Sequence, residues 1–173
     1  MNIQQDFEEL LKLLEDNSVR YLIVGGYAVA FHGFPRLTKD IDFYFDGSIE
    51  NVKNIINSLV EFGFPEKVLN FDMFTSEGNI ITFGVEPVRV DFLNQISGVD
   101  FKEAWDNKIR GKYGNVEVNF IGRTQLNVIY VFKRFSCSPS AHAPRDSTFQ
   151  LCKSLLWACG TLHLVFLQKS IIE

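Results

Sequence analysis

Hydrophobic positions in the first third of the chain recur with two different periods. Apolar side chains that fall three or four positions apart predict amphipathic helices, whereas strict alternation with polar residues predicts a strand. A short apolar run that stops at Gly25-Gly26 fits a buried strand followed by a tight turn. On this basis we predict helices over residues 3–16, 27–32 and 49–60, and strands over residues 21–24 and 40–45.

The middle of the chain is strand-like, with turn residues between short apolar runs. Tyr113-Gly114-Asn115 separates two of these runs, as expected of a β-hairpin. Glu86-Pro87 divides two others and predicts a turn. We therefore predict strands over residues 71–74, 79–83, 88–93, 108–112 and 116–120, and a short helix over residues 101–105.

The chain changes character after residue 125. The last 48 residues contain all three cysteines, carry a net charge of +3 against −7 for the first 125, and include a Ser/Pro/Ala-rich stretch over 136–148 that predicts a loop. We divide the chain into a domain of residues 1–125 and an atypical C-terminal tail of residues 126–173, whose final apolar run has no clear helical or strand period. The longest apolar run, residues 155–167, is shorter than the ~18–20 residues that span a bilayer.

Bulk composition narrows the function classes. The net charge of −4 argues against a basic nucleic-acid-binding surface, although a metal ion could still screen the phosphates of a nucleotide. The N-terminus has no signal-peptide pattern and the cysteines form no metal-ligand motif, so we expect a cytoplasmic protein with reduced thiols. P-loop and Rossmann glycine motifs are both missing from the sequence.

Two acidic residues on one predicted strand carry the chemistry. Asp40 and Asp42 are two positions apart, so a strand would present both carboxylates on the same face. Adjacent carboxylates repel one another unless a cation screens them, and Mg²⁺ prefers oxygen ligands of this kind. A two-metal site needs a further carboxylate from elsewhere, and Asp91, on the predicted strand 88–93, is the candidate.

The segment before these acids resembles a phosphate-binding turn. Glycines such as Gly25 and Gly26 let the backbone approach a phosphate, and the following helix would direct its N–H groups at the anion. Arg36 could contact phosphate directly, Thr38 could orient the loop, and Lys39 adds a second positive charge. Each feature alone is common in proteins without such a site, so the interpretation rests on their joint order and spacing.

Residues 23–44, IVGGYAVAFHGFPRLTKDIDFY, resemble the signature of the DNA polymerase β-like nucleotidyltransferase superfamily. The resemblance is greatest to the small bacterial branch of minimal nucleotidyltransferases and AbiEii-type toxin–antitoxin proteins, and it extends over roughly residues 5–125. Such chains continue into a helix bearing a Lys and a Gly-Arg-x-Lys-Asp-like stretch. This chain departs from that pattern after residue 126.

The resemblance implies an α/β (α+β) fold, with a mixed sheet flanked by helices and the strand of Asp40 and Asp42 beside that of Asp91. It implies transfer of a nucleoside monophosphate from a nucleoside triphosphate, ATP being favoured, to an acceptor hydroxyl. Asp40, Asp42 and Asp91 would hold two Mg²⁺ ions, with Mn²⁺ as an alternative, and Gly25 and Gly26 would hold the triphosphate.

The acceptor stays open at this point. It could be a cognate toxin or antitoxin protein, a tRNA or a small molecule, and a chain this short would need a homodimer to build a separate small-molecule pocket. The alternative is a non-catalytic module with a damaged C-terminus, which binds nucleotide or a protein without turnover. His32 is open between a contact with substrate and a packing role, the packing role being favoured.

Overall fold

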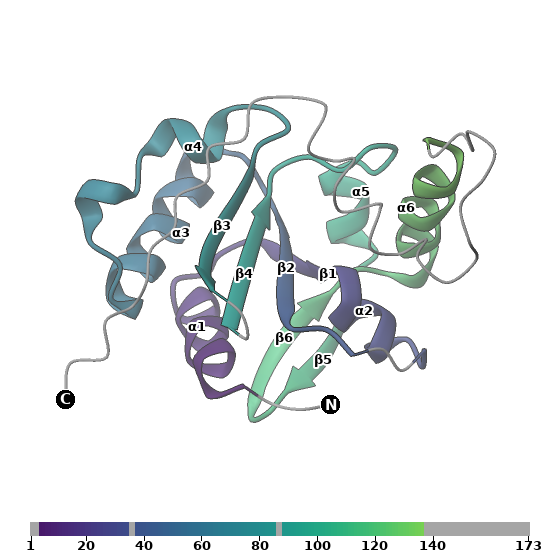
Figure 1. Ribbon diagram of the computed structural model, residues 1–173, viewed down its shortest axis with the longest axis horizontal. Helices are drawn as coiled ribbons and strands as arrows, with labels where there is room; N and C mark the ends of the chain where they lie inside the picture. The colour runs from purple at the N-terminus through teal and green to yellow at the C-terminus, as the bar shows by residue number, and fades with distance from the viewer. Residues whose placement is uncertain (1–3, 35–36, 86–87, 137–173) are drawn as a thin grey trace.

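A six-stranded mixed sheet forms the centre of the protein (Figure 1). The computed structural model describes residues 4–34, 37–85 and 88–136. The helices are α1 (Gln5–Asp16), α2 (Gly25–Phe31), α3 (Ile49–Phe62), α4 (Phe71–Thr75), α5 (Phe101–Asp106) and α6 (Arg123–Ser136), with a 3₁₀ turn η1 (Glu66–Val68). The strands are β1 (Tyr21–Val24), β2 (Asp40–Phe45), β3 (Ile80–Val85), β4 (Val88–Leu93), β5 (Ile109–Tyr113) and β6 (Val116–Phe120).

The strand order is β3-β4-β2-β1-β6-β5, so strands distant in sequence are neighbours in space. β2 pairs in parallel with β4 and antiparallel with β1, which places it in the interior of the sheet. In the view of Figure 1, α3 and α4 lie at one side of the sheet and α5 and α6 at the other. The predicted fold class, a mixed sheet flanked by helices, is confirmed.

The hydrophobic periodicity places the core as expected. α1 buries Phe7, Leu10, Leu11 and Leu14, and α3 packs against it through its own apolar face. Rings from β2, β3, β4 and α4 meet in an aromatic cluster made of Phe43, Phe45, Phe74, Phe83 and Phe92. Burial of these large apolar surfaces supplies the main favourable free energy of folding and makes the sheet around the acidic residues rigid.

One predicted strand is wrong. Residues 71–74 belong to the short helix α4, which begins after Asn70. The Asn70 side-chain oxygen accepts a hydrogen bond from the backbone N–H of Asp72 at 3.0 Å, which caps the helix. Phe74 is buried and Phe71 half-buried, three positions apart, as expected for one helix face rather than a strand.

The described part of the tail is helical. α6 runs from Arg123 across residue 125, where we divided the chain, and packs Leu126, Val128 and Ile129 against the core. The predicted turn at 86–87 and everything after residue 136, including the cysteines and the apolar run 155–167, lie outside the described residues. None of the helices in the described ranges has the length and apolar character needed to cross a membrane.

Candidate metal centre

The pairing of β2 with β4 brings three carboxylates together. Asp42 lies opposite Asp91 in the parallel register, and Asp40 is two residues before Asp42 on the same face of β2. One oxygen from each carboxylate lies within 4.8 Å of the other two. Asp40 and Asp91 are buried and Asp42 is half-buried. The predicted neighbourhood of these strands is therefore confirmed, whereas the catalytic role of the three acids stays a prediction.

Two threonines hold these carboxylates. The Thr38 hydroxyl donates to Asp40 Oδ1 at 2.6 Å, and the Thr82 hydroxyl donates to Asp91 Oδ1 at 2.8 Å. Thr82 is the register partner of Asp91 on the antiparallel strand β3. The sequence predicts that Thr38 orients the loop. It does not reveal Thr82, because the position of Thr82 beside Asp91 follows only from the register of β3 with β4.

Arg89 is the second residue that the sequence interpretation missed. Its Nη2 atom lies 2.7 Å from Asp40 Oδ2 and 2.9 Å from Asp91 Oδ2. Burial lowers the pKa of the guanidinium, but the Asp91 and Asp40 carboxylates raise the pKa more, so that it ends above its usual value. The alternation in Val88-Arg89-Val90-Asp91 could have revealed this residue, since it places Arg89 and Asp91 on one face of the strand.

The glycine pair lies against the acidic strand. Gly25 has a φ of +63°, and a Cβ atom there would lie 2.7 Å from Asp42 Cγ and collide with the carboxylate. A Cβ on Gly26 would lie 2.7 Å from the Cβ of Thr38. Both glycines start α2, rather than forming a separate turn before it. Their close approach to Asp42 and Thr38 is thus one physical reason for glycine here, independent of any phosphate.

Lys39 and Arg36 are the remaining residues predicted to bind nucleotide. Lys39 is exposed and directly precedes β2, while Arg36 lies outside the described residues. The Nε2 atom of His32 lies 2.8 Å from the carbonyl oxygen of Ile121, so this nitrogen carries the proton and donates it. The contact joins the end of α2 to the segment after β6, which is a packing role.

The donor set fits a divalent cation. Three carboxylates offer hard oxygen ligands, which Mg²⁺ and Mn²⁺ prefer over nitrogen or sulfur. Their spacing suits ions that share ligands, since paired metal ions in such sites lie about 3.5–4 Å apart. Among the described residues, these three aspartates are the acidic, histidine or cysteine side chains whose possible ligand atoms lie close enough together to share a metal ion.

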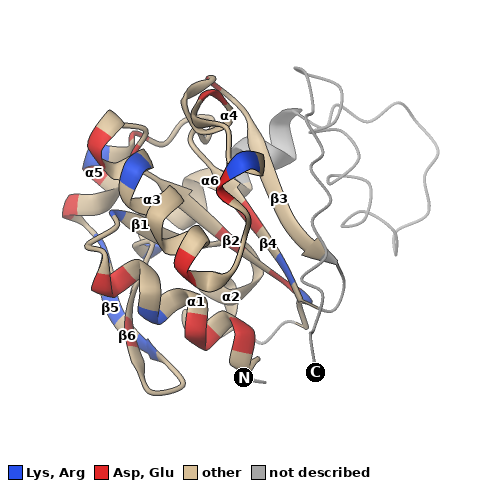
Figure 2. Cartoon of the chain, turned by 90° about the vertical axis from the view of Figure 1, so that its left-hand side faces the viewer, with Lys and Arg blue, Asp and Glu red and all other residues tan. Residues whose placement is uncertain are grey.

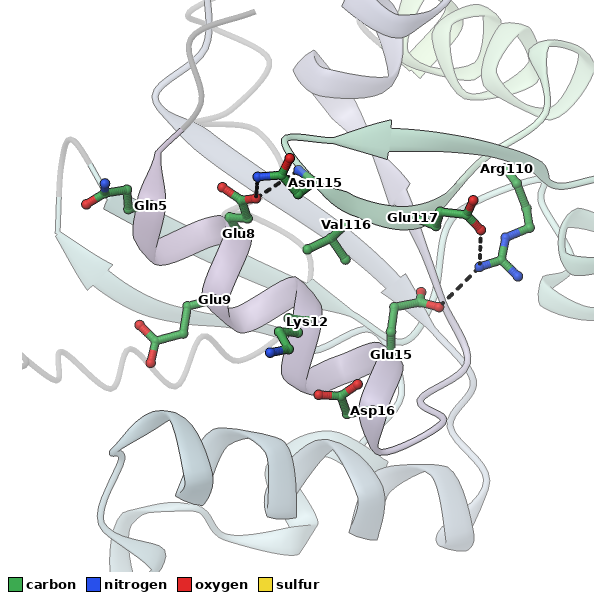
Figure 3. Close-up of a pocket in the computed structure, with 10 residues that line it drawn as sticks. All are labelled: Gln5, Glu8, Glu9, Lys12, Glu15, Asp16, Arg110, Asn115, Val116 and Glu117. Carbon is green, nitrogen blue, oxygen red and sulfur yellow. Dashed lines mark hydrogen bonds and ion pairs between the residues drawn. The ribbon is translucent and has the colours of Figure 1, made fainter.

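A surface hollow lies elsewhere, between α1 and the β5–β6 hairpin (Figure 3). Five of its polar residues already bind one another: Glu8 accepts hydrogen bonds from Asn115 at 2.8 and 3.0 Å, and Arg110 lies 3.6 Å from Glu15 and 3.4 Å from Glu117. The hollow is open, and its acidic side chains do not converge on one point (Figure 3). The three aspartates are therefore a better candidate for a metal site than this hollow.

Replacing Thr82 by Val should weaken divalent cation binding. The substitution keeps the shape of the side chain but removes the hydroxyl that orients Asp91. Loss of a partner that orients a metal ligand costs about 10–100-fold in affinity. Titration with Mn²⁺ should show this loss in Thr82→Val. It should not appear in Thr75→Val, where an exposed hydroxyl bonds only its own helix. Equal affinities in all three proteins would contradict the assignment.

Comparison with known proteins agrees with this architecture. No protein-family model and no curated protein matches the sequence. Among solved structures, the chain is similar to a Thermotoga maritima protein proposed to be a nucleotidyltransferase, with a TM-score of 0.53 and 15% sequence identity over 87% of this chain and 91% of that one. At this identity the likeness concerns the fold alone. The chain therefore shares the fold of that protein.

Proposed function

We propose that the protein is a metal-dependent nucleotidyltransferase that moves a nucleoside monophosphate from a nucleoside triphosphate, ATP being favoured, to an acceptor hydroxyl. The observation that carries the proposal is the convergence of Asp40, Asp42 and Asp91 within 4.8 Å. The neighbouring solved structure supports it only through the shared fold. Two Mg²⁺ ions, or Mn²⁺ in their place, would supply Lewis-acid stabilisation of the phosphate oxygens.

The proposed role of each aspartate follows from its position. Asp40 and Asp42 would hold both cations, and Asp91 would hold the one nearer the acceptor and take up the hydroxyl proton. The acceptor oxygen then forms a bond to the α-phosphorus while the bond from that phosphorus to its bridging oxygen breaks, which releases pyrophosphate. The hydrogen bonds from Thr38 and Thr82 would keep two carboxylates in place during this displacement.

Gly25 and Gly26 belong to the proposed nucleotide site, together with Arg36, Thr38 and Lys39. The glycines begin α2 directly after Val24, the register partner of Asp42, so the start of the helix adjoins the carboxylates. A triphosphate bound beside the metal ions would meet these backbone N–H groups.

The proposal leaves three classes of acceptor: a partner protein, as in a toxin–antitoxin pair, a tRNA, or a small molecule. A small-molecule acceptor would need a pocket that a homodimer completes. The competing function is a nucleotide- or protein-binding module without turnover, and what favours it is the departure of the chain after residue 126 from the pattern of similar chains. Turnover separates these two functions.

Label transfer tests the proposal. The full chain would be incubated with Mg²⁺, a bacterial lysate and each of the four nucleoside triphosphates, labelled either at the α- or at the γ-phosphate. We expect α-label, but no γ-label, on a protein, RNA or small molecule, and none when EDTA removes the metal. Transfer of γ-label would mean phosphoryl transfer instead. No transferred label from folded protein would favour the non-catalytic module.

A further inference from the structure

Arg89 bridges two members of the carboxylate group through a single nitrogen. Nη2 donates to both Asp40 Oδ2 and Asp91 Oδ2, at 2.7 and 2.9 Å. The arginine is the register partner of Asp40 and precedes Asp91 by two residues, so the sheet itself holds its side chain against both acids. The positive charge of Arg89 thus lies against two of the three acids, on strands where Figure 2 marks acidic positions in red and basic ones in blue.

The contact leaves part of the guanidinium unsatisfied. The Nε atom is buried and has no hydrogen-bond partner among the described residues. Arginine binds carboxylates best through two parallel N–H groups, a geometry that this shared Nη2 contact does not use. The side chain is 28% exposed, so it has an open side toward which it can move. The Arg89 guanidinium therefore neutralises charge on Asp40 and Asp91 without a full set of hydrogen bonds to fix its position.

A metal ion bound to Asp40 and Asp91 would compete with Arg89 for the Oδ2 atoms of these two carboxylates. The Oδ1 atoms of Asp40 and Asp91 already accept hydrogen bonds from Thr38 and Thr82. The Oδ2 atoms, which face each other across the two strands, accept from Nη2 of Arg89. A cation that Asp40 and Asp91 share through these oxygens would compete with the guanidinium, by charge repulsion and for the space between the two carboxylates.

We propose that Arg89 is a displaceable counter-ion that opposes metal binding to Asp40 and Asp91 until a nucleotide arrives. The inference rests on the proposed function. With the acids ionised, three carboxylates and Arg89 together carry a charge of −2, so one divalent cation neutralises them and a second leaves an excess of positive charge. The triphosphate offsets that excess, and it offers the guanidinium an anionic partner as suitable as a carboxylate. Metal ions then bind together with the nucleotide rather than before it.

Mn²⁺ titration followed by electron paramagnetic resonance tests this idea without any turnover. The wild type and Arg89→Gln would be compared with and without a non-hydrolysable ATP analogue. Without nucleotide, we expect Arg89→Gln to bind Mn²⁺ about tenfold more tightly, since a charge-assisted competitor has been removed. With the analogue present, affinity should rise more for the wild type than for the variant.

Arg110→Gln is the matched control, because Arg110 also bridges two carboxylates, Glu15 and Glu117 (Figure 3), but lies on β5, which β6 and β1 separate from β2 in the sheet. Its Mn²⁺ affinity should equal that of the wild type. Adding Asp42→Asn to Arg89→Gln should weaken the binding, which assigns the Mn²⁺ to the three aspartates. If Arg89→Gln does not fold, Arg89→Lys serves instead, with an affinity expected between those of wild type and a charge-free site.

The outcomes separate the two proposals. Unchanged or weaker Mn²⁺ binding by the Arg89 variants, with normal binding by the wild type, would overturn the counter-ion role and leave the nucleotidyltransferase proposal intact. No Mn²⁺ binding by any of these proteins, even with the nucleotide analogue, would overturn both.

Discussion

The Asp42→Asn variant is expected to transfer nucleotide at least about 1000-fold more slowly than the wild type. Asp42 lies between the other two acids, as the neighbour of Asp40 along β2 and the register partner of Asp91 on β4. Asparagine has nearly the same shape but lacks the negative charge that a bound cation requires. Metal ions in such sites supply several kcal/mol of transition-state stabilisation, and each 1.36 kcal/mol corresponds to a tenfold change in rate.

Transfer of α-label to the acceptor measures this effect, with circular dichroism to show that the variant is folded. Asp106→Asn is the control, because Asp106 is an exposed acid that pairs only with Lys102 in its own helix. It should transfer label at the wild-type rate. A rate for Asp42→Asn within tenfold of wild type would remove Asp42 from the catalytic group.

The Gly25→Ala variant is expected to lose both stability and activity, for two separate reasons. A residue with a φ of +63° pays a backbone strain of about 1–2 kcal/mol when it carries a Cβ atom. The added methyl group would also collide with the Asp42 carboxylate and push it out of line with Asp91. A displacement of about 1 Å in a reacting group can cost roughly 100-fold in rate, and we expect a loss of that size.

Gly33→Ala separates the two effects. Gly33 also has a positive φ, +93°, but a Cβ atom there would have no heavy-atom neighbour within 4 Å. Both variants should therefore lose free energy of unfolding in urea through backbone strain, and Gly25→Ala should lose more, because its Cβ atom also collides with Asp42. Only Gly25→Ala should lose transfer activity. If the two variants lost activity to the same extent, backbone strain alone would explain the result, and contact with Asp42 would not be the reason for Gly25.

Much of the fold was predictable because its elements have local signals. The apolar positions of α1 and α3 repeat with the helical period, and the β5–β6 hairpin has its turn residues in the chain itself. The prediction at α4 was wrong because Phe71, Met73 and Phe74 alone do not distinguish a single turn of helix from a short strand. The hydrogen bond from the Asp72 backbone N–H to the Asn70 side chain, which caps the helix, stabilises the helical form.

The site was predictable only in part, since its parts meet through pairing between distant strands. Asp40 and Asp42 form a local pattern. Asp91 joins them through a parallel register with a strand about 50 residues away, so the sequence offers it only as an acid on another predicted strand. Thr82 depends on a further register, that of β3 with β4. The ion pairs of Arg89 depend on the same sheet, although its alternation with Asp91 was visible in the sequence.

The most direct test of the account is the position of bound metal ions. Crystals of the full chain grown with Mn²⁺ and a non-hydrolysable ATP analogue would be examined by anomalous scattering at the manganese absorption edge. We predict anomalous density within bonding distance of Asp40, Asp42 and Asp91, in contact with the triphosphate. Nucleotide bound without manganese at these carboxylates, or manganese held only elsewhere, would contradict the assignment of this group as the catalytic metal centre.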